Sequence, residues 1–361
     1  MEEDRCFGYQ VIIAVTYDDG RLFPLTEDCP KCMLPVANRV LLSYQLDVLK
    51  QSGASEIFVV TPQEYHSQLS QYVTQYSPEM VIEVVPVAEM IGSADAVRAV
   101  ADRIRGDFIV VNADTLSQIN LGELVRTHRL RSSDVTMLLS AIPLEEPDKK
   151  GGKATLKIDE EDQEFISLTS TGRVVMKTPA LELDGGAVGI GKPLLRQFGG
   201  SGGLSLRCDV TDTGIYVMSF WLMEFLLAKK NLSSLRADVM PYLVSRQSQS
   251  PATLLSSLPG LQHRRRPMQT IDPWLASLRS AIPSPHTPSF DVVSREFDES
   301  STEMSETIRC SYLSAQGSGA PGMLTLHRAA SDKDSIQGTG GELGDDLLRC
   351  FSVLVDSPPP V

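Results

Sequence analysis

Short apolar runs alternate with amphipathic stretches over residues 9–247. The first run, at residues 10–16, contains Val11-Ile12-Ile13-Ala14-Val15, which is typical of a strand covered on both faces. Residues 40–51 then place their apolar side chains at helical spacing, and Gly53 follows where a helix C-cap is expected. Repetition of this strand-helix unit predicts an α/β fold, with a mostly parallel Rossmann-like sheet and helices on both faces.

The same pattern predicts the remaining elements of this domain. Further strands are expected at residues 56–61, 81–86, 107–112, 134–141, 205–210 and 214–218, and helices at residues 64–76, 94–104, 121–130, 219–230 and 233–247. Three short strands joined by turns, at residues 154–158, 164–168 and 173–177, predict a small antiparallel insertion.

The pattern changes after residue 247. Residues 248–307 are rich in Ser, Pro and charge, which predicts a low-complexity, disordered linker. Residues 308–361 show weak strand character at 308–313 and 324–326 and no hexapeptide repeat, so they form an unassigned and poorly ordered tail. We therefore expect a single α/β domain at residues 9–247.

Composition narrows the class of partner. The formal net charge of −13 disfavours nucleic-acid binding, because attraction to phosphate requires clustered Lys and Arg. The start carries Glu2, Glu3 and Asp4 instead of a secretory signal, and no apolar stretch reaches the roughly 18 residues of a membrane helix. Six cysteines are too few for a disulfide scaffold of this size. We expect a cytosolic protein that meets protein partners or a small ligand, without a membrane.

The segment that follows the first strand carries an ordered set of motifs. Gly20-Arg21 is followed by Pro24-Leu25-Thr26, Pro30-Lys31 and Leu34-Pro35-Val36. This order resembles the signature of the sugar-nucleotidyltransferase, or nucleotide-sugar pyrophosphorylase, family. The resemblance implies that Arg21 and Lys31 face nucleotide phosphates and that Asp114, after a central strand, helps to hold Mg²⁺.

Several positions depart from that signature. Tyr17 and Asp19 stand where the family has two glycines before Arg21. Asp18 and Asp19 would face phosphates, and one like-charge pair at about 4 Å costs on the order of 1–4 kcal/mol. Cys32 replaces a second proline, and residues 176–178, Met-Lys-Thr, stand where the family shows Glu-Lys-Pro.

These departures lead us to predict no catalytic residues and no cofactor. Gly20, Arg21, Lys31, Gly92 and Ser93 are interpreted as vestigial nucleotide- or phosphate-site positions, and Asp114 as a vestigial metal position, with no metal bound. A simpler interpretation also stands for the charged residues. Arg21 and Lys31 would pair with Asp18, Asp19 or Glu27, and Asp114 would cap a turn.

Other candidate sites have simpler interpretations as well. Cys29 and Cys32 form a CxxC pair, but zinc needs two further ligands and no second pair follows, which favours ordinary thiols. Asp209 and Asp212 could supply a second metal carboxylate, although turn and cap roles are favoured. Five scattered histidines form no triad with a nucleophile. Gly92-Ser93-Ala94 either matches the family's nucleobase segment or starts a helix with a Ser N-cap.

A closer resemblance covers residues 10–247. The matching motifs are Gly92-Ser93-Ala94-Asp95, the Lys/Gly-rich insertion at residues 149–153, Ser170-Thr171-Gly172-Arg173, residues 212–216 and, most distinctively, residues 234–247. They are similar to the branch of the family that serves in the guanine-nucleotide exchange factor for translation initiation factor 2. The resemblance implies a non-catalytic scaffold that pairs with a catalytic epsilon-type subunit and contacts initiation factor 2. That branch also carries a left-handed β-helix, of which residues 308–361 show no clear sign.

Two alternatives stay open at this point. Retention of Arg21, Lys31 and Asp114 is compatible with an active pyrophosphorylase that uses a nucleoside triphosphate, a sugar phosphate and Mg²⁺. A pseudoenzyme that binds a nucleotide without turning it over is also compatible with the damaged loop.

Overall fold

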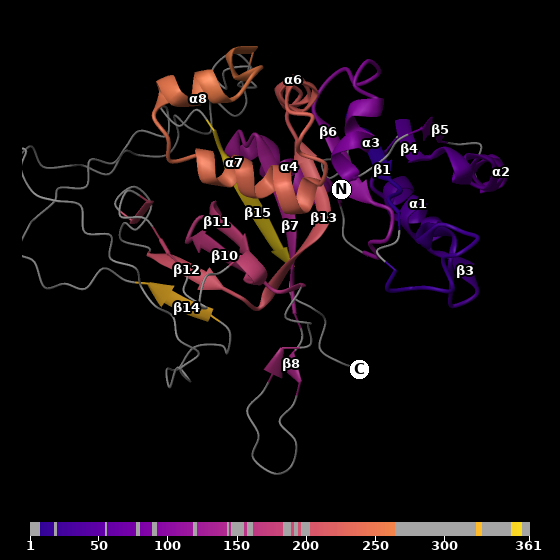
Figure 1. Ribbon diagram of the computed structural model, residues 1–361, viewed down its shortest axis with the longest axis horizontal. Helices are drawn as coiled ribbons and strands as arrows, with labels where there is room; N and C mark the ends of the chain where they lie inside the picture. The colour runs from indigo at the N-terminus through magenta and orange to yellow at the C-terminus, as the bar shows by residue number, and fades with distance from the viewer. Residues whose placement is uncertain are drawn as a thin grey trace, which may run out of the picture.

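The protein is described by a computed structural model (Figure 1). The residues that it describes are 8–17, 20–54, 56–76, 80–88, 92–117, 121–142, 144–145, 155–156, 162–182, 189–190, 194–195, 203–263, 323–326 and 348–355.

A seven-stranded mixed sheet forms the centre of the fold. Its order is β15 (Cys350–Val355), β7 (Val135–Ala141), β13 (Val210–Met218), β6 (Phe108–Asn112), β1 (Gln10–Ala14), β4 (Glu56–Pro62) and β5 (Val81–Val87). All neighbours are parallel except β13, which runs antiparallel to both β6 and β7. This arrangement confirms the predicted mostly parallel α/β fold.

Burial of both sheet faces explains the continuous apolar runs. Along β1, Ile12 and Ala14 join one buried cluster, whereas Val11 and Ile13 join the other. Because successive side chains of a strand point to opposite faces, an uninterrupted apolar run requires cover on both sides. The sheet therefore has a hydrophobic core on each face.

Helices supply that cover. One face is covered by α1 (Leu41–Gln51), α2 (His66–Tyr76) and α4 (Leu121–Arg131). The other face is covered by α3 (Ser93–Ala99), α6 (Trp221–Ala228), the π-helical turn η6 (Leu235–Val239), α7 (Met240–Arg246) and α8 (Pro251–Ser257). Among the described residues, no helix is long and apolar enough to cross a membrane.

A small antiparallel sheet lies beside the main one, at the lower left in Figure 1. Its order is β11 (Val174–Pro179), β10 (Glu164–Thr169), β12 (Leu204–Arg207) and β14 (Met323–Leu326). Short pairs are formed by β2 (Pro35–Val36) with β3 (Arg39–Val40), and by β8 (Leu144–Glu145) with β9 (Thr155–Leu156). The predicted insertion is present, and β14 matches the strand expected at residues 324–326.

Some predicted bounds differ from the structure. The strand expected at residues 205–210 ends at Arg207, and residues 210–218 form one long strand, β13, instead of a separate segment at 214–218. The helix expected at residues 94–104 ends at Ala99 and continues as turns. The helix expected at 233–247 begins as η6.

Residues beyond 247 contribute to the core more than the sequence pattern predicts. The linker expected at residues 248–307 is wrong over residues 251–263, because α8 is followed by a 3-10 helix at Leu261–His263, and Leu254 and Leu258 are buried in the same cluster as Val135. The tail expected at 308–361 supplies β14 and the edge strand β15. The rest of both ranges, including the strand expected at 308–313, lies outside the described residues.

Candidate functional site

The sequence-predicted site residues lie on segments that follow parallel strands. The loop after β1 carries Arg21 and leads into the short 3-10 helix Lys31–Met33, and Asp114 follows β6. Because β1 and β6 are adjacent and parallel, their carboxyl ends share one edge of the sheet, where open α/β sheets place their ligands. The described fold therefore brings the predicted phosphate and metal positions to the same edge.

Arg21 is paired with a carboxylate far away in the sequence. Both of its terminal nitrogens donate to Asp162, with Nη2 to Oδ1 at 3.1 Å and Nη1 to Oδ2. Hydrogen bonding from Arg21 lowers the pKa of Asp162, and the charges of Arg21 and Arg236 add to this shift. The pair lies at the surface. The partner predicted for Arg21 was a neighbouring acid, and Asp18 and Asp19 lie outside the described residues.

Lys31 and Asp114, the predicted phosphate and metal positions, lie next to each other. Lys31 Nζ is 3.8 Å from Asp114 Oδ2, an ion-pair distance that is too long for a direct hydrogen bond. Gln45 fixes the turn that carries Asp114, because its Nε2 donates to the carbonyls of Asn112 at 2.8 Å and Thr115 at 2.6 Å. No local sequence signal indicates this role of Gln45, which lies on α1.

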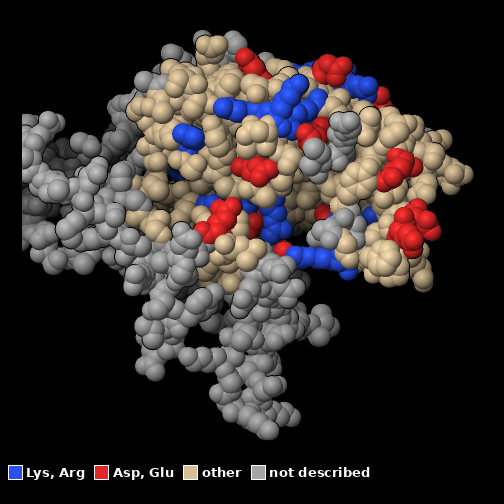
Figure 2. All heavy atoms as spheres, viewed as in Figure 1, with Lys and Arg blue, Asp and Glu red and all other residues tan. Residues whose placement is uncertain are grey.

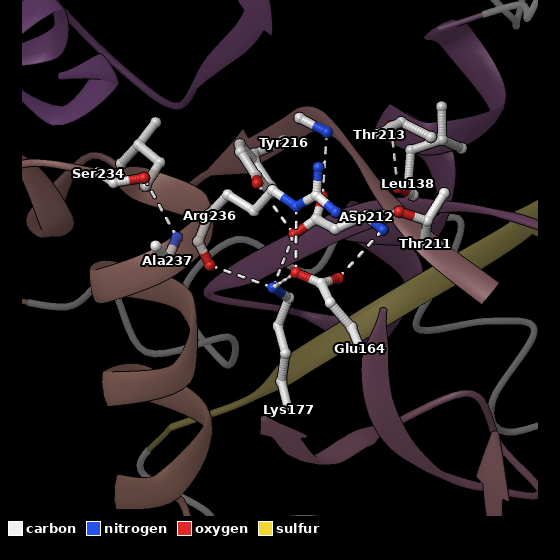
Figure 3. A network of polar contacts seen from close by, with 12 residues as sticks. Leu138, Glu164, Lys177, Thr211, Asp212, Thr213, Tyr216, Ser234, Arg236 and Ala237 are labelled. Atoms are coloured by element: carbon white, nitrogen blue, oxygen red, sulfur yellow. Dashed lines mark hydrogen bonds and ion pairs between the residues drawn. The ribbon is translucent and has the colours of Figure 1, made fainter. Parts of the chain in front are cut away.

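A second group of charges is buried where the main sheet meets the small sheet (Figure 3). Lys177 on β11 donates through Nζ to Glu164 Oε1 on β10 at 2.8 Å and lies 3.5 Å from Asp212 Oδ2 on β13. It also donates to the carbonyl of Arg236 at 3.1 Å. The side chains of Lys177 and Asp212 are 1% and 0% exposed, so these charges are balanced by each other and not by water.

Arg236 and Tyr216 complete this group, which we call the buried ion cluster: Glu164, Lys177, Asp212, Tyr216 and Arg236. Arg236 Nε donates to Glu164 Oε1 at 3.0 Å, and its Nη2 donates to Thr211 Oγ1 at 3.0 Å. Tyr216 donates its hydroxyl to Asp212 Oδ2 at 2.9 Å. Burial raises the pKa of Asp212, although Lys177 opposes the shift. Burial and the adjacent Asp212 raise the pKa of Tyr216.

The two groups form one alternating series of charges. Arg21 pairs with Asp162, and the charge of Arg236, a member of the buried ion cluster, also lowers the pKa of Asp162. Three cations, Arg21, Arg236 and Lys177, are thus matched by three carboxylates, Asp162, Glu164 and Asp212. In Figure 2, basic and acidic atoms lie next to each other in the hollow near the centre of the face shown.

The segment predicted to face a nucleobase packs against another part of the chain. A Cβ on Gly92 would lie 2.3 Å from the carbonyl oxygen of Ser233, so only glycine fits there. Ser93 Oγ accepts a hydrogen bond from Leu235 N at 2.9 Å. The expected Ser N-cap is wrong, because α3 begins at Ser93 and Gly92 is its N-cap. A nucleobase role for this segment stays a prediction.

The remaining candidates have structural partners. Asp212 Oδ1 accepts from Gly214 N at 3.0 Å, which is the expected turn role, and Asp209 is held by two hydrogen bonds from Arg207. Cys32 is buried in the core, and this burial raises the pKa of its thiol to about 12. In the described part of the chain, no three His, Cys, Asp or Glu side chains are grouped to hold a metal ion.

Gly20 is exposed and has φ of +89°. This left-handed backbone conformation suits glycine, so Gly20 keeps a backbone conformation that the other residue types of the loop rarely adopt.

The sheet topology is consistent with a nucleotidyltransferase α/β fold, and residues 19–162 match the family model described as nucleotidyl transferase. Among curated proteins, the chain is similar to translation initiation factor eIF2B subunit gamma of Dictyostelium discoideum, at 25% identity over 317 residues that cover 84% of this chain and 68% of that protein. It is also similar to eIF2B subunit gamma of Schizosaccharomyces pombe, at 24% identity over 69% of this chain and 54% of that protein.

The epsilon subunit of eIF2B from S. pombe matches a shorter region, at 30% identity over 35% of this chain and 19% of that protein. Both gamma subunits match most of this chain. The chain is therefore similar to eIF2B gamma subunits over most of its length, and to nucleotidyl transferases over residues 19–162.

Proposed function

We propose that this chain is a non-catalytic subunit of an eIF2B-type complex. In this role it is a scaffold for a catalytic epsilon-type subunit, which exchanges GDP for GTP on translation initiation factor 2. The names of the similar gamma and epsilon proteins support membership of such a complex. The proposal places the chain in the cytosol with the translation machinery and requires no cofactor, nucleic acid or membrane.

The observation that carries the non-catalytic role is the internal pairing of the phosphate-site cations. Transfer of a nucleotidyl group needs cations that neutralise the phosphates in the transition state. Here Arg21 is paired with Asp162, and Lys31 with Asp114. A phosphate would have to displace a carboxylate at each position.

Reconstitution with an epsilon-type subunit tests the proposal. The full chain is co-expressed with a tagged epsilon subunit, and GDP release from initiation factor 2 is measured with and without the chain. We expect co-purification in equal amounts and faster GDP release than with the epsilon subunit alone. An unrelated α/β protein of similar size serves as the control. Elution of the chain as a separate monomer, with no effect on release, would contradict the proposal.

An active nucleotide-sugar pyrophosphorylase is the second candidate, and the location of Lys31 and Asp114 at one edge of the sheet, where α/β sheets place their ligands, favours it. Pyrophosphate release from nucleoside triphosphate, Mg²⁺ and a panel of sugar phosphates is the assay. Asp114→Ala is a suitable control because the Asp114 side chain is 43% exposed and its loss should leave the fold intact. Turnover that exceeds this variant would support the enzyme. Calorimetry with GTP and ATP would detect a pseudoenzyme that binds without turnover.

A further inference from the structure

Two tyrosine rings and a carboxylate lie together where two strands of the main sheet end. Tyr17 follows β1, whereas Glu64 and Tyr65 lie on the 3-10 helix η2 (Gln63–Tyr65), which follows β4. Because β1 and β4 are adjacent and parallel, the segments that follow them share one edge of the sheet. The ring centroids of Tyr17 and Tyr65 are 6.1 Å apart, at an interplanar angle of 58°. We call this group the tyrosine site: Tyr17, Glu64 and Tyr65.

Glu64 makes these rings favourable for a cation. Burial raises the pKa of both tyrosines, and the charge of Glu64 and its hydrogen bonds with their hydroxyls raise it further, to about 12 for Tyr65. A hydroxyl that donates to a carboxylate leaves more negative charge on its ring, and the negative face of an aromatic ring attracts Lys and Arg. Tyr17 is 46% exposed, and Glu64 is exposed as well. A cation from outside can therefore reach a ring and the carboxylate together.

The chain contains one filled arrangement of this kind. The guanidinium of Arg39 lies 4.7 Å from the ring centroid of Tyr44 and pairs with Asp47. Within the described part of the chain, no Lys or Arg lies over a ring of the tyrosine site or pairs with its carboxylate. The filled arrangement shows the geometry that a cation from another molecule would adopt at the tyrosine site.

The surroundings of the tyrosine site favour a protein side chain over a nucleotide. The first loop packs against the segment after β4, because Gln68 on α2 donates through Nε2 to the carbonyl of Asp28 at 3.1 Å. This loop exposes Phe23 and Leu25, at 68% and 66%, and exposed apolar side chains beside a polar group are typical of protein contact surfaces. Glu64 would repel a phosphate group but attract a basic side chain.

We propose that the tyrosine site binds an arginine side chain of a protein partner, with the guanidinium over a tyrosine ring and paired with Glu64. Arginine fits better than lysine because its planar guanidinium stacks on an aromatic face and still donates to a carboxylate. Tyrosine and arginine are both enriched among the residues that contribute most to binding at protein interfaces. The inference rests on the proposed function only in that a scaffold needs partner surfaces, and it names one such surface and the residue type that it recognises.

Nuclear magnetic resonance titration of the full chain, labelled isotopically at its tyrosine rings, tests the inference. The probes are the capped tripeptide Leu-Arg-Leu and the same tripeptide with citrulline, which has the shape of arginine but no charge. Tyr17→Phe and Tyr65→Phe each remove one signal and thereby assign it. We expect the arginine peptide to shift both signals in a saturable way, and the citrulline peptide to shift neither.

Two variants and a matched control locate the contact. Glu64→Gln removes an exposed carboxylate and Tyr17→Leu removes an exposed ring, and each should weaken binding of the arginine peptide about two- to fivefold. Asp47→Asn removes the same charge from another exposed position, at 39%, and should leave the affinity unchanged. Thermal unfolding of each variant checks that the fold is intact.

The inference is overturned if the arginine peptide shifts neither signal, or if the citrulline peptide shifts both equally, because the contact would then not depend on charge. It is also overturned if Asp47→Asn weakens binding as much as Glu64→Gln does, or if GDP shifts both signals at lower concentration than the arginine peptide. Reconstitution with an epsilon-type subunit measures assembly and not this contact, so failure of the two proposals can be distinguished.

Discussion

Removal of the buried cation Lys177 should destabilise the protein strongly. Lys177→Met keeps a long apolar side chain but leaves Glu164 and Asp212 without their shared cation. These carboxylates are 7% and 0% exposed, so water cannot replace the ammonium group. Loss of one partner from a buried ion pair costs about 3–5 kcal/mol. Since domains are stable by about 5–15 kcal/mol, the variant should lose a large share of its stability.

Urea unfolding followed by circular dichroism measures this loss. Arg39→Met is the control, because the exposed Arg39–Asp47 pair should contribute only about 0–1 kcal/mol. A second variant, Lys177→Met combined with Asp212→Asn, should recover part of the loss, because one unpaired buried charge is then removed. The Asn oxygen can still accept from Gly214 N, which Asp212 binds in the wild type.

The deficit of Lys177→Met should also depend on pH. Burial already raises the pKa of Asp212 in the fold, and Lys177 is the largest influence that lowers it. Without Lys177 the folded-state pKa rises further above its unfolded value of about 3.9. The folded state then binds more protons than the unfolded state, so stability is lost as pH rises and recovered as pH falls toward 4. A loss of stability below about 1 kcal/mol, with no pH dependence, would refute the conclusion that water is excluded from the charges of the buried ion cluster.

Three further predictions concern packing and protonation. Gly92→Ala should cost about 1–3 kcal/mol because its Cβ meets backbone at 2.3 Å, whereas Gly106→Ala, which has open space, should leave the melting temperature unchanged. Gln247→Leu should cost about 1–3 kcal/mol and speed hydrogen exchange at the Cys350 amide, which donates to Gln247 Oε1. Burial lowers the pKa of His128 to about 3 in the folded state, whereas its unfolded value is about 6.5. Below about pH 6.5 the unfolded state therefore binds more protons than the folded state, and the free energy of unfolding falls by up to about 1.4 kcal/mol per pH unit toward pH 3. His128→Gln should flatten that dependence in urea unfolding at pH 7, 5.5 and 4.5, and an unchanged slope would contradict the assignment.

Local signals were sufficient for most strands of the main sheet. The apolar run of β1 predicts burial on both faces of the strand, even when the neighbouring strands are unknown. Lys31 and Asp114 could be placed at one sheet edge because the carboxyl ends of parallel strands meet there. The resemblance supplied the reason to examine these two residues, whose side chains lie 3.8 Å apart.

Contacts between distant segments were not predictable. Asp162 is 141 residues from Arg21, and nothing in either local sequence specifies the other as its partner. The apolar run Cys350–Val355 is a strand signal in itself, but its place beside β7 depends on Asp134, which accepts from Arg349 N across 215 residues. Helix α8 was missed because its Ser-rich sequence resembles a linker, and only Leu254 and Leu258 show its buried side.

The motifs that carry the family resemblance hold the architecture together in this chain. Ser93 of the Gly-Ser-Ala-Asp motif accepts from Leu235 N, which belongs to the motif at residues 234–247. Gln247, at the end of that motif, accepts from Arg173 Nε at 3.0 Å and from Cys350 N at 3.0 Å, so two motifs fix the start of β15. Because these contacts involve packing and buried hydrogen bonds, their loss would damage the fold. Arg21, which the resemblance implies faces phosphates, carries no such structural requirement, because its ion pair is exposed. The fold therefore depends on these packing motifs more than on Arg21 of the first loop.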